Sequence, residues 1–101
     1  MMFDLRFSFT ASLWRWQSDK ASWYFVTLPV EDGQHIRFAK GKGAGFGSVR
    51  VLAQIGDTSW KTSIFPDKKS GSYILPVKAA VRNAEDLTPD TPIQIMISVI
   101  D

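Results

Sequence analysis

The sequence predicts one mainly β domain, a small closed β-barrel with two short helices. Three observations support this fold class. Apolar and polar residues alternate in several short runs, turn residues separate those runs, and 101 residues with a 45% hydrophobic share are enough for one core. A closed barrel also leaves no strand edge open to aggregation. We therefore take residues 1–101 as a single β-barrel domain.

The first half of the chain contains two strands and a weak helix. Apolar residues alternate with polar ones over residues 3–13, which is the clearest strand signal in the sequence. A second strand over residues 23–28 is apolar on both faces and stops at Pro29, which has no N–H to donate. Two carboxylates then suit the first turn of a helix. Its predicted buried stripe is Ile36 and Ala39.

The second half of the chain contains more strands and a better helix. Gly56 and Asp57 form a tight turn between two alternating runs, which predicts a β-hairpin. Pro76 begins the helix, because its missing N–H would be unpaired at the first helical position anyway. The predicted apolar stripe of this helix is Val77, Ala80, Val81 and Ala84. The strands of this half are predicted over residues 49–55, 58–65, 73–75 and 93–99.

Two short segments indicate an internal repeat. Residues 27–30 read Thr-Leu-Pro-Val and residues 74–77 read Ile-Leu-Pro-Val, and each follows an aromatic strand and opens a predicted helix. The pattern predicts two strand–helix–strand halves related by a pseudo-two-fold axis. The alternative is coincidence, because the shared motif is short and its residues are common. Shared topology in residues 22–55 and 71–100 would separate the two interpretations.

The charge distribution is more informative than the net charge of +2, which makes only a weak field. Residues 33–56 contain no acid, whereas several bases fall there together with Phe46. We treat these bases as a candidate anion or nucleic-acid surface, and they are Arg37, Lys40, Lys42 and Arg50. The alternative is a solvated surface with uneven charge. The glycines of residues 41–47 predict a mobile connection rather than a P-loop, because a strand follows them instead of a helix.

Nothing in the sequence predicts catalysis. The chain has no cysteine and one histidine, His35, which lies in the weak helix without a nucleophile motif nearby. Glu85 and Asp86 are adjacent, so on a helix they point apart and do not form an acid–base pair. We therefore expect no enzyme activity, no cofactor and no metal site. The lack of cysteine, of a signal-type N-terminal stretch and of a long apolar segment predicts a cytoplasmic protein without a membrane partner.

Four motifs in order along the chain resemble the successive signatures of the domain-of-unknown-function family nineteen-oh-five (DUF1905). They are Trp23–Pro29, Gly45–Val51, Thr62–Pro66 and Leu75–Arg82. The resemblance implies a small β-barrel of the double-split kind with short helices, in a family that occurs mainly in bacteria. It implies no activity, because the family carries none that transfers to these residues.

Two functions remain open from the sequence. The first is a non-enzymatic module that binds a small molecule, a peptide or a protein, because the chain has four Trp and no catalytic residues. Its candidate cleft residues are Trp14, Trp16, Phe46 and Trp60. The alternative is nucleic-acid binding, through the four basic residues or as a barrel like a transcription regulator. Residues 75–97 are similar to the hairpin unit of the swapped-hairpin transition regulators, although residues 89–92 replace the glycine-aspartate of that unit.

Overall fold

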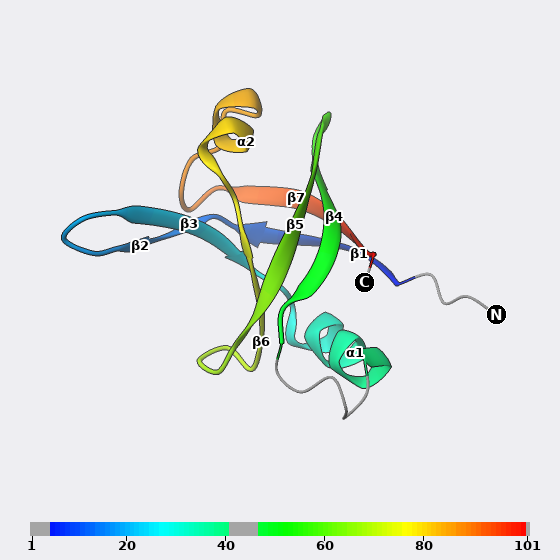
Figure 1. Ribbon diagram of the computed structural model, residues 1–101. Coiled ribbons are helices and arrows are strands. Elements are labelled where there is room, and N and C mark those ends of the chain that lie inside the picture. Colours follow the sequence, from blue (N-terminus) through cyan, green and yellow to red (C-terminus); the bar gives the residue numbers. More distant parts are fainter. Residues whose placement is uncertain (1–4, 41–46, 101) are drawn as a thin grey trace.

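Seven β-strands and two α-helices make up the part of the chain that the computed structural model describes, residues 5–40 and 47–100 (Figure 1). Each predicted strand and helix has a counterpart, and one further strand, β2, follows the first predicted strand where no strand was predicted. In chain order the elements are β1 (Arg6–Ser12), β2 (Trp14–Gln17), β3 (Ser22–Thr27), α1 (Val30–Lys40), β4 (Val49–Ile55), β5 (Thr58–Asp67), β6 (Ser72–Pro76), α2 (Ala79–Ala84) and β7 (Pro92–Val99).

The strands form one antiparallel sheet, in the order β1-β7-β4-β5-β6-β3-β2, which curls into a half-barrel. The edge strands β1 and β2 do not pair with each other, so the prediction of a closed barrel is wrong for the described residues. The reason is that β1 and β2 are consecutive in the chain and separated only by Leu13. Leu13 is fully buried, and its carbonyl accepts the backbone N–H of Asp90 at 3.1 Å. The chain itself connects the two edges, where a closed barrel would need a ladder of hydrogen bonds.

The two halves of the predicted repeat have the same topology. The first is β3–α1–β4 and the second is β6–α2–β7. The first strands of the two halves pair with each other, β3 antiparallel to β6, and so do the last strands, β4 antiparallel to β7. In the same way, β5 pairs first with β4 and then with β6, while the β1–β2 chain pairs first with β7 and then with β3. The halves therefore meet the topological condition of the repeat hypothesis.

Alternation along the strands directs one set of side chains into a single hydrophobic core. The strand β4 illustrates it, because Val51 is fully buried and the next residue, Leu52, is exposed. Residues from both halves contribute, so the core spans the whole domain. The core side chains with no exposed surface are Leu13, Val26, Ile36, Val51, Ala53, Ile64, Leu75 and Ile95.

The helix α1 packs against β6 through a glycine. A Cβ at Gly33 would overlap the side chain of Ser72 on β6, so the two backbones can approach only because residue 33 has none. Ser72 is fully buried, and its hydroxyl donates to the carbonyl of Pro29 at 3.2 Å. This contact places the first turn of α1 on the sheet.

Both helices differ in detail from the prediction. The helix α2 begins at Ala79 rather than at Pro76, because Pro76 is still the last residue of β6 and lies opposite Phe25 of β3. Ile36 and Val81 are buried as predicted, but other members of the two stripes face solvent. These exposed members are Ala39, Ala80 and Ala84. Within the described residues, neither helix has the length and apolar character needed to cross a membrane.

Candidate functional site

A cavity of about 300 Å³ opens beside α2, and we call it the α2 pocket. Residues of β3, β5, the end of β6 and α2 line it, so both halves of the domain contribute. The lining residues are Ser22, Trp23, Tyr24, Trp60, Lys61, Thr62, Pro76, Val77, Lys78, Ala79 and Arg82.

The α2 pocket lies where β5 and β6 separate. Only the end of β5, Phe65–Asp67, pairs with β6. The preceding part of β5, Thr58 to Ile64, pairs with β4. Beyond this point β6 continues beside β3, and Figure 1 shows β5 and β6 diverging towards α2. Alternate residues of an antiparallel strand turn their backbone N–H and C=O away from the paired neighbour. The stretch of β5 over Trp60–Thr62 therefore adds backbone donors and acceptors to the wall of the pocket.

Arg82 is ordered by two contacts at this pocket. Its Nε donates to the carbonyl of Val77 at 3.1 Å, and its guanidinium carbon lies 3.8 Å from the centre of the Tyr24 ring. A cation above an aromatic face is attracted by the quadrupole of the ring. The remaining guanidinium N–H groups have no acceptor among the described residues. An ordered guanidinium with spare donors suits a carboxylate or a phosphate.

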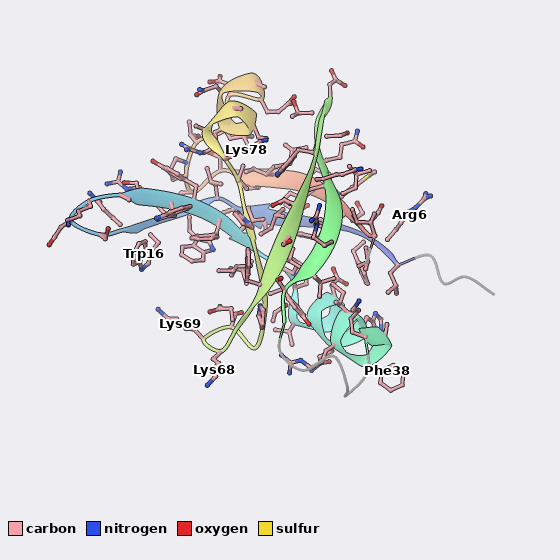
Figure 2. The ribbon with its side chains drawn as sticks, viewed as in Figure 1. Arg6, Trp16, Phe38, Lys68, Lys69 and Lys78 are labelled. Atoms are coloured by element: carbon pink, nitrogen blue, oxygen red, sulfur yellow. The ribbon has the colours of Figure 1, made fainter. Side chains whose placement is uncertain are left out.

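The other charges of the pocket are also positive and are not neutralised by neighbouring acids. Lys61 and Lys78 line the cavity, both are exposed, and none of the lining residues is acidic. Figure 2 shows Lys78 beside the start of α2. Of the two acids that follow this helix, Glu85 and Asp86, Glu85 is bound elsewhere, because its carboxylate accepts the hydroxyl of Thr58 at 2.6 Å. It lies over Gly56 in the β4–β5 turn, where a Cβ would overlap it.

A second feature is the group of aromatic side chains on the outer surface of the β2–β3 hairpin. Val26 of β3 is buried, so the odd-numbered residues of β3 face outward, as do their partners across the ladder. Trp16 and Trp23 are directly paired and are 50% and 54% exposed. Figure 2 shows Trp16 projecting from the hairpin on the side away from α2. We call this set the outer aromatic face, and its members are Trp14, Trp16, Trp23, Phe25 and Phe65.

The structure does not gather the predicted cleft residues in one place. Trp60 lines the α2 pocket and is 8% exposed, so it forms part of the wall and part of the core. Trp14 and Trp16 lie on the outer aromatic face, where the ring of Trp14 packs against Phe25 at a centroid distance of 5.0 Å. Phe46 lies outside the described residues. Trp23, which was not among the predicted residues, borders both features.

The predicted basic surface is divided between two elements. Arg37 and Lys40 belong to α1, Arg50 belongs to β4, and each of the three has an interaction partner within the protein. Arg37 also borders a separate cavity of about 320 Å³ at the β5–β6 turn, together with Asp67. Lys42 lies outside the described residues, as does most of the glycine-rich loop.

Asp32 of α1 is partly buried, and its carboxyl group has a perturbed pKa. Burial raises the pKa of Asp32 above its usual value, repulsion from Glu31 raises it further, and attraction to His35 acts in the opposite direction. His35 itself is exposed, and its ring centre lies 6.4 Å from that of Phe7 on β1. In residues 5–40 and 47–100, no three His, Asp or Glu side chains gather in an arrangement that could hold a metal ion.

Of the residues that line the α2 pocket, sequence reasoning predicted only Trp60, and it missed Tyr24 and the three cations Lys61, Lys78 and Arg82. One signal was available, because Lys78 and Arg82 are four residues apart and such residues lie on one face of a helix. The sequence could not place them beside Tyr24. That contact depends on the pairing of β3 with β6, which joins segments far apart in the chain.

Comparison with known families supports the resemblance seen in the motifs. The model of a family described as a domain of unknown function (DUF1905) matches residues 9–97, a range that includes all the lining residues of the α2 pocket. Among curated proteins there is no significant match.

Proposed function

The chain belongs to the DUF1905 family, whose description assigns no activity. We propose from the site that the protein is a non-enzymatic module that binds a small molecule in the α2 pocket. The observation that carries the proposal is a cavity with aromatic walls and three cationic side chains. Ligand pockets in proteins combine apolar walls with a few placed polar groups, and they begin at about 300 Å³. A cavity of this size favours a small molecule over a peptide or a protein.

The test is a titration with small organic fragments, monitored by NMR spectroscopy. Labelled protein is titrated with a mixture of small organic fragments, and the indole N–H of Trp60 and the backbone amides of Lys61 and Thr62 serve as reporters. We expect at least one fragment to shift these signals in a saturable way, while the indole N–H of Trp16 stays in place. The proposal is wrong if no fragment perturbs the reporters of the pocket.

A matched pair of variants identifies the site. Ala79 lines the cavity and Ala80 does not, although both are exposed residues of the same helix. Ala79→Phe should fill the cavity and abolish the shifts, whereas Ala80→Phe should preserve them. Equal behaviour of the two variants would place the binding elsewhere.

A second candidate function, binding of single-stranded nucleic acid, is favoured by the outer aromatic face. Exposed Trp and Phe rings are surfaces on which bases stack, at about 1–3 kcal/mol per base. The same NMR sample separates this function from the first. An oligonucleotide should shift the indole N–H of Trp16 and not that of Trp60, and its affinity should fall steeply with salt.

We also infer that the curled sheet is of the double-split barrel type and that the protein is cytoplasmic. Two places where a strand changes its pairing partner support the barrel type. The β1–β2 chain changes partner at Leu13, and β5 changes from β4 to β6 after Ile64. They occupy equivalent places in the two halves. The absence of cysteine supports a reducing compartment. A crystal structure in which the sheet encloses the core on all sides would support the barrel type, and a flat, open sheet would contradict it.

A further inference from the structure

Resting on the proposed function, we infer that the ligand of the α2 pocket is a small organic anion. Its carboxylate or phosphate group lies among Lys61, Lys78 and Arg82, and its apolar body lies against Trp60 and Val77. The inference adds to the proposed function the chemical class of the ligand and the residues that select it.

The first step is the excess of positive charge. The three charged residues that line the pocket, Lys61, Lys78 and Arg82, are all basic. None of them has an ion pair among the described residues, and no acid lines the cavity. Like charges gathered around a concavity raise the local concentration of counter-ions. An anion that enters would relieve their mutual repulsion, whereas a cation would add to it.

The second step is the removal of the local acid. Glu85 follows Arg82 by three residues, which is a spacing at which helical side chains can pair. The hydrogen bond from Thr58 at 2.6 Å holds the Glu85 carboxylate at the β4–β5 turn instead. Arg82 is held by Val77 and Tyr24 and keeps donors for another acceptor. The Glu85 carboxylate thus has a partner other than the guanidinium, and the next acid, Asp86, lies beyond the helix with a left-handed backbone (φ 53°).

The third step concerns the rest of the ligand. Trp60, Pro76 and Val77 supply apolar walls, and Thr62 supplies a hydroxyl beside the backbone edge of β5. A cavity of about 300 Å³ holds a body of one or two rings and is too small to enclose a nucleic-acid strand. A ring-bearing carboxylate and a ring-bearing phosphate share the chemistry that these residues recognise.

The test uses four probes that differ in charge and body. Phenyl phosphate and benzoate carry both features, benzyl alcohol carries the ring alone, and inorganic phosphate carries the charge alone. We expect the two ring-bearing anions to bind by isothermal titration calorimetry and to shift the NMR signals of Trp60, with weaker binding at higher salt. The stronger of the two identifies whether carboxylate or phosphate is preferred.

Lys78→Gln is the informative variant, because the Lys78 side chain makes no hydrogen bond among the described residues, and the backbone bonds of its carbonyl to Val81 and Arg82 are kept in the variant. It should weaken binding of the preferred anion by roughly tenfold, which is the contribution of one charge-assisted hydrogen bond. Lys69→Gln removes a lysine that is exposed outside the pocket and should leave the affinity unchanged. Arg82→Lys keeps the charge but loses the planar donor pair, so it should also weaken binding.

Two failures are distinguishable. If benzyl alcohol binds as well as benzoate and Lys78→Gln has no effect, the anion inference is overturned and the small-molecule pocket stands. If no probe and no fragment perturbs the pocket, the proposed function fails and the inference fails with it.

Discussion

At the residue scale, Gly33 is the position where one methyl group has the largest predictable effect. A Cβ there would overlap Ser72 Oγ and would lie 3.1 Å from the Cα of Ser72. Ser72 cannot move away easily, because it is fully buried and bonded to Pro29. From the sequence alone, Gly33 is only a residue that lowers the propensity of its segment to form a helix. The sequence could not supply the reason, since Ser72 is distant in the chain.

We expect Gly33→Ala to lower the free energy of unfolding by about 1–3 kcal/mol, the range for overpacked sites. The effect should appear even though alanine forms helices better than glycine by about 1 kcal/mol. Urea denaturation measures it. Adding Ser72→Ala should recover part of the loss, and Gln34→Ala on the exposed side of α1 should change stability little. A Gly33→Ala protein as stable as the parent would contradict the close packing of α1 on β6.

At the element scale, the β2–β3 hairpin combines two kinds of tryptophan. Trp14 is half-buried, packs against Phe25, and its Nε1 donates to Thr27 Oγ1 at 2.9 Å. Trp16 is half exposed and faces only Trp23 across the ladder. Sequence alternation located β3 but not β2, and it could not show this difference, because both residues occupy the same face at a spacing of two.

Trp14→Ala should therefore lower the free energy of unfolding by about 2–3 kcal/mol, through lost packing and a lost hydrogen bond. Trp16→Ala should lower it by less than about 1 kcal/mol, the value of a cross-strand pair. Guanidinium denaturation of the two variants checks this order. If the order were reversed, the contacts of Trp14 with Phe25 and Thr27 would not be the stabilising ones.

The boundaries of the helices are the other difference at this scale. Proline was a sound signal for the end of a strand and for a change of direction, but β6 holds Pro76 within its ladder to β3. This is compatible with the missing N–H because Val77, the next residue, donates to Tyr24 at 2.9 Å. The local rule placed the proline at the start of a helix, and long-range pairing placed it in a strand.

At the scale of the whole molecule, Leu13 is the residue through which the chain passes from one edge of the sheet to the other. Leu13→Ala should lower the free energy of unfolding by about 2–5 kcal/mol, because a fully buried leucine is removed. Leu52 is 39% exposed on β4 and provides the matched control, with an expected change below about 1 kcal/mol. Thermal and chemical denaturation measure both. Similar losses in the two variants would contradict the enclosed position of Leu13.

The sequence predicted the single core and the doubled topology, because alternation and the two Leu-Pro-Val segments are local signals. It did not predict the open sheet or the α2 pocket. Alternation indicates which residues point inward, but not whether two edges meet. The pocket exists because β5 stops pairing with β6 after a few residues, and that is a property of strand register across the whole molecule.

The two helices are unequal, with eleven residues in α1 and six in α2. The longer helix packs closely on the sheet at Gly33, so we expect substitutions around it to act mainly on the stability of the fold. The shorter helix borders the α2 pocket, and we expect substitutions around it to act mainly on the proposed binding there. The proposed function therefore implies that binding can be altered by substitutions at α2 while the packing of α1 on the sheet is kept.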